Sequence, residues 1–470
     1  MCRQVRRDPD GSGHRRPPRP LARGGCPHRP AHCPHTRRGG SRMTGTSAST
    51  AAPRGQLPSD FWRLWSAGVV SRLGSGLVGA AMPLLAAQLT RDPRQVALVS
   101  VFSGLPWVLL ALHSGALADR WDRRRTMWLC DVAAAVVQLV LAVVVIAGGA
   151  RIWTLCLTAF VATSLLTLFD SASQAALPSV VPAPLLGRAN SRVYAGTVLA
   201  GMFVGPPLGS WLFSVADGLP FLLNAASFLG SAALLATIGT RIAGRAAGAS
   251  RTRLTADIGE GLRWLWSHRQ LRWLVVLLAC WNLIENAYLG ILVLYALEVL
   301  DVGASAYGVL LTGVGAGGLL GAAAAPWLSR RLGDGVVIAG TVALTVVGTA
   351  GLALTRHLAA AVGFLAVIGA AAFAFNVVTV TYRQSVVPGA LQGRVSSAYR
   401  FATWGITPLG AALGGLAAHT VGVVGVLAGA AVALAVVGLA VLPQLSNARL
   451  RQHAAPAATP PDRDTIQTSR

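Results

Sequence analysis

A single carboxylate lies deep inside a long apolar stretch of the chain, between two amides. The segment NLIENAYL (282–289) places Asn282, Glu285 and Asn286 at i, i+3 and i+4, which is one face of a helix. Glu285 is about 14 residues into the stretch 271–299, roughly 21 Å at 1.5 Å per residue. A charge at that depth of a membrane costs about 2.5–3.5 kcal/mol, so it should face a cavity or a partner. We predict that Glu285 takes up and releases protons, with Asn282 and Asn286 in a substrate cavity; the alternative is a structural carboxylate bound to an arginine.

Arg72 is the only arginine well inside an apolar stretch, about ten residues into the stretch 64–89. Small residues surround it in the sequence and leave space for its side chain. Two interpretations stay open for a role in proton coupling or binding: Arg72 neutralises Glu285 across a central cavity, or it binds an anionic group of a substrate. The rival is that its long side chain reaches the membrane surface.

Five further polar residues in the apolar stretches are candidates for a site. Gln138 and Asn224 are expected either to line the substrate cavity or to bridge neighbouring helices. Asp131, Asp170 and Asn376 are nearer the ends of their stretches and are candidates for a gate. No grouping of Ser, His and Asp suggests an enzyme, no phosphate-binding loop suggests direct use of ATP, and we expect no cofactor.

The elements that position these residues are long apolar segments. The chain is 53% hydrophobic and 12% charged, with a mean hydropathy of +0.56. A membrane span needs about 20 apolar residues to cross roughly 30 Å of hydrocarbon. Twelve stretches meet this need, so we predict an all-α polytopic membrane protein with twelve transmembrane helices: 64–89, 96–118, 126–147, 152–175, 192–214, 219–240, 271–299, 304–328, 335–355, 358–381, 395–418 and 420–442.

The formal charge of +23 comes from arginine alone, since the sequence has no lysine. The arginines gather on alternate loops, and the other loops carry only Arg91, Arg94, Arg151 and Arg356. This asymmetry follows the positive-inside rule. It predicts a multi-pass protein of the cell (plasma or inner) membrane with both termini in the cytoplasm, and it gives no reason to expect a nucleic-acid partner.

Both ends of the chain have the composition of disordered segments. Residues 1–60 form a basic arm, of which 1–42 looks like an over-extended start before Met43, and 443–470 form a tail. The stretch CPHRPAHCPH (26–35) has metal-ligand residue types, but its prolines and the lack of a surrounding fold argue against a site. We therefore expect no bound metal.

An internal repeat divides the apolar stretches into two sets of six. SVVPAPLLGRANS (179–191) matches SVVPGALQGRVSS (385–397) at an offset of 206 residues. Repeated helix bundles with a substrate site between them are typical of transporters. We predict two pseudo-symmetric six-helix bundles, 61–240 and 271–442.

The connection between the two bundles, 241–270, is basic and then amphipathic. Within GEGLRWLWSHRQLRWL, residues Leu262, Leu265 and Trp266 share one face. We expect this segment along the cytoplasmic membrane surface; the alternative is a short helix packed under the bundles.

Two motifs resemble those of the major facilitator superfamily. The loop GALADRWDRRR (115–125) resembles the signature G-x-x-x-D-R-x-G-R-R, with Asp122 at the usual second glycine. The segment GMFVGPPLGS (201–210) is similar to the antiporter motif G-x-x-x-G-P-x-x-G-G, with Ser210 at the last glycine. The matching residues are Gly115, Asp119, Arg120, Arg123 and Arg124 in the loop, and Gly201, Gly205, Pro206 and Gly209 in the second motif.

The residues of the second motif also have a mechanical interpretation that needs no family. Gly201, Gly205 and Gly209 lie at i, i+4 and i+8, which lets another helix approach closely. Pro206 removes a backbone donor and bends the helix.

The sequence of residues 61–442 resembles the branch of proton-coupled exporters that includes enterobactin and macrolide efflux proteins. The resemblance implies a twelve-helix fold with alternating access, in which the loop around Asp119 latches the halves together. It departs at Ser75, where an acid is common, and at Ala134, where an arginine often follows Asp131. If the branch uses the acid at position 75 for coupling, this chain needs another residue.

The combined prediction is a monomeric transporter that exports a small, partly apolar molecule (a drug, macrolide or siderophore) by proton antiport. Two alternatives stay open. The first is uptake or sodium coupling, and the second is a transport-inactive membrane partner or sensor.

Overall fold

The computed structural model describes residues 56–110, 122–239, 254–388 and 391–454, all within the unit formed by residues 53–470. These residues form helices joined by short turns, without a strand among them. The helices of the first half are α1 (Ser59–Leu89), α2 (Pro93–Leu109), α4 (Arg123–Ile146), α5 (Ile152–Val180), η1 (Ala183–Leu185), α6 (Leu186–Val198), η2 (Leu199–Val204), α7 (Gly205–Val215) and α8 (Leu219–Ala236). Those that follow are α9 (Leu254–Ser267), α10 (Arg269–Leu289), α11 (Leu292–Leu294), η3 (Tyr295–Val299), α12 (Ala304–Leu332), α13 (Asp334–Leu354), α14 (Leu358–Val386), α15 (Gln392–Trp404), α16 (Thr407–Val441), η4 (Leu442–Leu445) and α17 (Asn447–Ala454).

Most of these helices are long and apolar enough to cross a membrane. The described residues contain nine such spans, or ten if α10 and the bent α11–η3 segment are one span. Large apolar side chains point outward, and Leu320, Leu354 and Leu439 keep 71–84% of their surface exposed. Lipid covers such surfaces in a membrane protein, whereas their exposure to water would be unfavourable. The chain is therefore an all-α, multi-pass membrane protein.

Two helices need separate mention because they do not count as ordinary single spans. α2 has 17 residues up to Leu109, and the rest of its expected stretch, up to 118, lies outside the described residues. α16 is interrupted at Gly422, whose φ of +76° lies in the left-handed region that glycine tolerates best. The expected boundary between the stretches ending at 418 and starting at 420 lies a few residues before this break.

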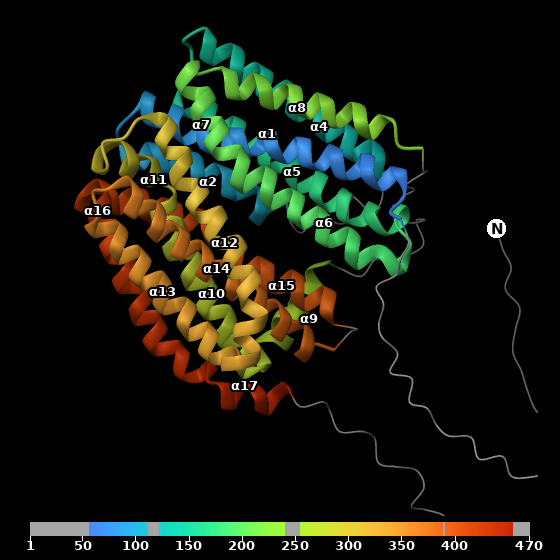
Figure 1. Ribbon diagram of the computed structural model, residues 1–470, viewed down its shortest axis with the longest axis vertical. Helices are drawn as coiled ribbons and strands as arrows, with labels where there is room; N and C mark the ends of the chain where they lie inside the picture. Colours follow the sequence, from blue (N-terminus) through green and yellow to red (C-terminus); the bar gives the residue numbers. More distant parts are fainter. Residues whose placement is uncertain (1–55, 111–121, 240–253, 389–390, 455–470) are drawn as a thin grey trace, which may run out of the picture. The chain divides into compact units, whose positions relative to one another are not determined.

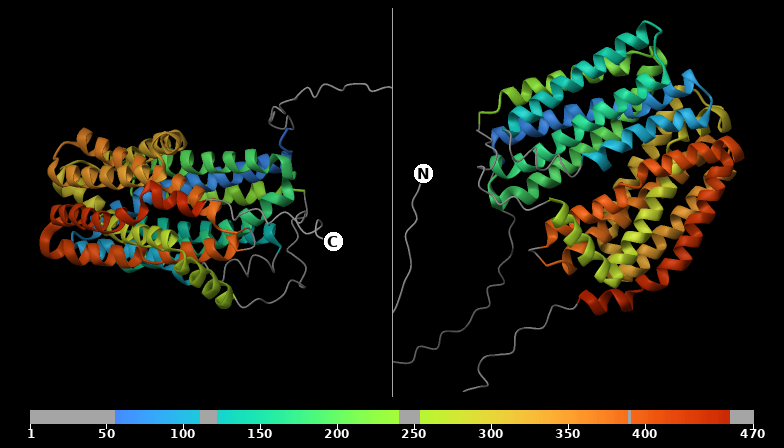
Figure 2. Two further views of the ribbon diagram at one scale, coloured as in Figure 1. Left: turned by 90° about the horizontal axis from the view of Figure 1, so that it is seen from below. Right: turned by 180° about the vertical axis from the view of Figure 1, so that it is seen from behind.

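The helices of α1–α8 pack on one another, and those of α10–α16 do the same (Figures 1 and 2). α1 packs on α7 and α8, and α4 on α5 and α8. In the later part of the chain, α14 packs on α12 and α13, and α16 on α10 and α13. Two seams join the halves: α2 with α16, and α7 with α12.

Successive helices run in opposite directions, so the bundle has two ends. We call the end where α1 begins the near end and the end where α1 finishes the far end. At the near end, Arg63 Nη1 donates to the Thr237 carbonyl oxygen just after α8, over 3.1 Å. At the far end, Gln88 Nε2 donates to Asp217 Oδ1 just before α8, over 3.3 Å.

The segment between the halves packs against protein along one face. Gly261 of α9 lies against α15, where a β-carbon would come within 2.5 Å of the Arg394 carbonyl oxygen. Glu260 Oε2 accepts a hydrogen bond from Arg394 Nη1 at 2.7 Å, and Leu265 is fully buried. Leu262 and Trp266 stay exposed. In the structure this segment therefore packs against α15.

Candidate functional site

The charged pair in the middle of the first half joins α1 to α5. Arg72 Nη2 donates to Asp170 Oδ1, and the two side chains are only 25% and 20% exposed. The proposed pairing of Arg72 with Glu285 is not found, because α5 lies against α1 and supplies a nearer carboxylate. Asp170, a gate candidate, is the counter-ion of Arg72.

Glu285 occupies an aromatic environment in the second half. Its carboxylate accepts a hydrogen bond from Trp281, one turn earlier on α10, and Tyr288 lies one turn later on the same face. Trp281 packs on Phe375 of α14 with ring centroids 5.1 Å apart. Within the described part of the chain, Glu285 makes no ion pair with an arginine or histidine. The carboxylate can therefore change its charge without breaking a salt bridge.

The two amides beside Glu285 bond to backbone. Asn282 Nδ2 donates to the Thr403 carbonyl oxygen at 2.7 Å, next to the bend between α15 and α16. Asn286 Nδ2 donates to the Asn282 carbonyl oxygen at 2.8 Å. Both side chains are partly exposed, and Asn376 of α14 is exposed. Asn282 thus links α10 to the bend of a neighbouring helix.

Three other candidates are buried inside the first half. Gln138 on α4 and Asn224 on α8 are 2% and 1% exposed, so neither lines an accessible surface in this conformation. Asn224 Oδ1 accepts from Ser227 at 3.3 Å, and both lie against Gly74 of α1. In this conformation both are buried rather than exposed to a cavity, and the hydrogen bond of Asn224 stays within α8. Asp131 on α4 is equally buried.

Of the loop motif, Gly115, Asp119 and Arg120 lie outside the described residues, whereas its last arginines are described. Arg123 Nη1 donates to the Ala175 carbonyl oxygen of α5 at 2.8 Å. Arg124 donates to the carbonyl oxygens of Leu235, at 3.1 Å from Nε, and of Ala236. The last carbonyl groups of a helix lack partners within it and attract cations. These arginines thus anchor the start of α4 to the near ends of α5 and α8.

The glycine motif brings α7 against α1. A β-carbon at Gly209 would lie 2.2 Å from the Leu77 carbonyl oxygen, and one at Gly205 would lie 2.6 Å from Gly76 Cα. A π-helical turn, η2, directly precedes Gly205 and Pro206, since proline has no N–H for the regular ladder. The motif therefore places a distorted helix in backbone contact with the helix that carries Arg72.

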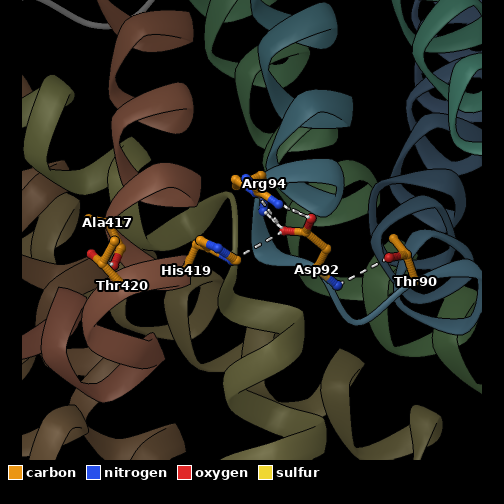
Figure 3. A network of polar contacts seen from close by, with 6 residues as sticks. All are labelled: Thr90, Asp92, Arg94, Ala417, His419 and Thr420. Atoms are coloured by element: carbon orange, nitrogen blue, oxygen red, sulfur yellow. Dashed lines mark hydrogen bonds and ion pairs between the residues drawn. The ribbon is translucent and has the colours of Figure 1, made fainter.

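Polar side chains at the far end join the two halves. Asp92 accepts from Arg94 Nη2 at 2.9 Å and lies 4.0 Å from His419 Nδ1, as Figure 3 shows. The hydrogen bond from Arg94 holds the pKa of Asp92 below its usual value, and the charges of Arg94 and His419 act in the same direction. Arg91 and Glu298 form a second such contact at 3.9 Å. Sequence reasoning missed this network; the only signal was the presence of opposite charges in far-end loops.

Apolar and backbone contacts between the halves lie in the same region. Ser210 Oγ of α7 donates to the Ser305 carbonyl oxygen of α12 at 3.2 Å. Trp107, near the end of α2, and Trp404, the last residue of α15, lie with ring centroids 6.1 Å apart. A β-carbon on Gly415 would lie 2.5 Å from Ala97 Cβ. Among the described residues, the contacts that close the seams thus run from the middle of the helices to the far end.

Comparison with known proteins gives one family and several relatives. The family described as transmembrane secretion effector matches residues 48–464. An uncharacterized MFS-type transporter of Mycobacterium tuberculosis is 35% identical over 167 residues, which are 34% of this chain and 37% of that protein. The multidrug efflux pump Tap of Mycolicibacterium fortuitum is 28% identical over 381 residues, which are 76% of this chain and 88% of Tap.

The solved structures show a shared fold. A bacterial homologue of the iron transporter ferroportin in its inward-facing state has a TM-score of 0.66 at 19% identity, covering 83% of this chain and all of that one. In its outward-facing state the homologue has a TM-score of 0.57 at 18% identity, covering 83% and 99%.

Proposed function

This chain belongs to the transmembrane secretion effector family of major facilitator transporters, and we propose that it exports a small, partly apolar molecule in exchange for protons. Relatives and structural neighbours are transporters, so the membrane helices described above act as a carrier rather than as an enzyme. The name of Tap, a multidrug efflux pump, supports export and a drug-like substrate.

Twelve membrane passes in two sets of six are part of this proposal. The nine long spans become ten with the bent α10–η3 pair. They become eleven with α2, and twelve when α16 is divided at Gly422. The repeat at an offset of 206 residues supports two bundles, 61–240 and 271–442. The distribution of arginines supports a cytoplasmic near end and cytoplasmic termini, with 1–60 and 443–470 as tails.

In this orientation, the far-end contacts close the outer side of the carrier. Ser210–Ser305, Arg91–Glu298 and Asp92–His419 join the halves there. The higher TM-score to the inward-facing state of the ferroportin homologue is consistent with an inward-facing carrier. Export then needs these contacts to separate when the near end closes, with the loop 115–125 as the near-end latch. All three are exposed or neutral contacts, which are individually weak.

The observation that carries proton coupling is Glu285, a carboxylate deep in a span with no cationic partner in the described residues. Burial favours the neutral acid, and contact with water or a cationic substrate favours the anion. A residue with both properties can take a proton on one side and release it on the other. Arg72 and Asp170 neutralise each other, which leaves Glu285 as the better carrier.

The test is accumulation of a panel of compounds in cells that express the chain, with and without a protonophore. The panel holds a lipophilic dye, a macrolide and a catechol siderophore. We expect lower accumulation of at least one compound, and we expect both the protonophore and Glu285→Gln to abolish the effect. Glu260→Gln is the matched control, because that glutamate lies in an exposed ion pair on α9.

Three results contradict parts of this account. Export that persists in Glu285→Gln removes Glu285 as the carrier. Export that follows a sodium gradient and ignores the protonophore replaces protons by sodium. No change in accumulation across the panel favours the alternative of a transport-inactive partner or sensor. The serine at position 75, where an acid is common in related exporters, supports that alternative.

A further inference from the structure

A second carboxylate in the membrane helices lacks a partner, and it lies in the other half of the chain. Asp131 on α4 is 2% exposed, and its Oδ2 atom has no hydrogen-bond partner. The Ser231 hydroxyl on α8 faces the carboxylate and is fully buried. That hydroxyl oxygen also lacks a partner in bonding geometry. Two unsatisfied polar atoms thus face each other across the packed α4–α8 seam.

The helices packed against α4 bring no positive charge to Asp131. α8 has no charged residue between Leu219 and Ala236. α5 has one, Asp170, and Arg72 neutralises it. On α4 itself, Arg123 and Arg124 lie two turns before Asp131 and donate to carbonyl groups of α5 and α8. The neighbouring Cys130 is a free, buried thiol.

An ionised carboxylate in such a place is unfavourable. Removing a charge from water costs several kcal/mol, and only a partner charge or several hydrogen bonds offset this. A protonated carboxyl group loses this penalty and gains a donor, and the Ser231 oxygen is positioned to accept from it. One hydrogen bond from the Ser231 hydroxyl would offset only part of the penalty of the anion, whereas the added proton removes the charge and leaves a hydrogen bond between two neutral groups.

We propose that Asp131 binds a proton in this conformation. It is then a second proton site, in the first half of the carrier, in addition to Glu285 in the second half. The proposal rests on proton-coupled transport as the function, and it implies two exchangeable protons in each cycle. Sodium fits less well, because Ala134, Ala135 and Phe228 fill the space one turn further along the seam. A proton needs no cavity.

The route for this proton runs along the seam to the near end. Leu235 and Ala236 lie one turn beyond Ser231 on α8, and Arg124 covers their carbonyl groups. Displacement of Arg124 from these carbonyl groups would admit water from the near end to Asp131.

Infrared difference spectroscopy of the purified full chain and its variants in identical lipid nanodiscs tests this directly, because the C=O stretch of a carboxylic acid is lost when the group ionises, while the lipid ester and amide bands cancel in the difference. At neutral pH we expect two bands from buried acids. Asp131→Asn should remove one and keep the other, and Glu285→Gln should do the reverse. Asp170→Asn, the matched control for an ionised buried aspartate, should leave both. Asparagine is nearly isosteric with a protonated aspartate, so Asp131→Asn should also unfold at the same temperature as the natural chain.

The outcomes separate the two claims. If Asp131→Asn leaves both bands, or if sodium chloride at neutral pH removes the Asp131 band, the second proton site is wrong. If Glu285→Gln removes no band, the coupling residue proposed above is wrong while Asp131 stands. If Asp131→Asn does not fold, Ser231→Ala is the alternative test. It should shift the band of Asp131, because it removes the hydrogen-bond acceptor of that carboxyl group. An unshifted spectrum overturns the proposal.

Discussion

The ion pair between Arg72 and Asp170 gives the sharpest prediction for stability. Removing one partner of a fully buried pair costs about 3–5 kcal/mol, because the other charge stays in an apolar place. Here the two side chains keep 25% and 20% of their surface exposed, so water offsets part of this penalty. We therefore expect Asp170→Asn and Arg72→Gln each to lower the free energy of unfolding by about 2–3 kcal/mol.

The double variant separates the pair from its surroundings. With both charges gone, no uncompensated ion is left, so the double variant should be more stable than the sum of the single effects predicts. We expect a coupling free energy of about 2 kcal/mol, above the roughly 0.5 kcal/mol within which independent sites add. The measurement is reversible unfolding of the purified protein in mixed micelles, by the change in helix content with added detergent.

A second cycle supplies the control. Arg72→Gln combined with Glu285→Gln should be additive, because the structure places no ion pair between these residues. Strong coupling in this cycle, with additivity between positions 72 and 170, would refute the reasoning and restore the pairing of Arg72 with Glu285.

Three other variants test separate parts of the structure. Gly209→Ala should destabilise by about 1–3 kcal/mol or more, since its methyl group meets the Leu77 carbonyl oxygen, whereas Gly79→Ala, with open space, should be near neutral. Asn447→Ala should cost about 1–2 kcal/mol, because Asn447 Oδ1 accepts from the Gly335 amide at 2.7 Å at the start of α13; Asn447→Asp should recover part of this. Asp92 has a lowered pKa in the folded protein, so its ionised form stabilises the fold above pH 3.8, the pKa of the unfolded chain. This stabilisation is lost as the pH falls through the pKa of the folded state, and Asp92→Asn should not show this loss of stability in acid.

Each of these has a result that contradicts it. Equal unfolding free energies for Gly209→Ala and Gly79→Ala would mean that α1 and α7 are not in backbone contact. An Asn447→Ala variant as stable as the natural chain would remove the role of α17 in anchoring α13. For Asp92, an acid profile identical to that of Asp92→Asn would show that Arg94 does not hold its charge.

The sequence predicts the helices well because a bilayer imposes their length and polarity. The bend expected from Pro206 is found as a π-helical turn just before it, whereas the break at Gly422 inside α16 lies a few residues beyond the expected boundary at 418–420. Where two orientations of a helix have similar energies, the sequence did not predict which one the protein adopts. Leu265 packs inward while Leu262 and Trp266 stay exposed, although all three share one face in a helical projection.

The candidate site was less predictable because its partners are far apart in the chain. Periodicity showed that Arg72 and Glu285 lie inside spans, but not that α5 offers Arg72 a nearer acid, 98 residues away. The burial of Gln138 on α4 and of Asn224 on α8 depends on which faces of these two apolar helices pack against their neighbours, and their sequences leave this undetermined. Asp92 and His419 meet only because two far-end turns are brought together by the packing of α2 on α16.

The most direct test of proton-coupled export uses the purified chain in liposomes that contain a pH-sensitive dye. A gradient of a compound exported in the cell assay is imposed without any initial pH difference. The account predicts that protons move against the direction of the compound, and that Glu285→Gln abolishes this movement while Glu260→Gln keeps it. Movement of the compound with no change in internal pH would contradict proton antiport.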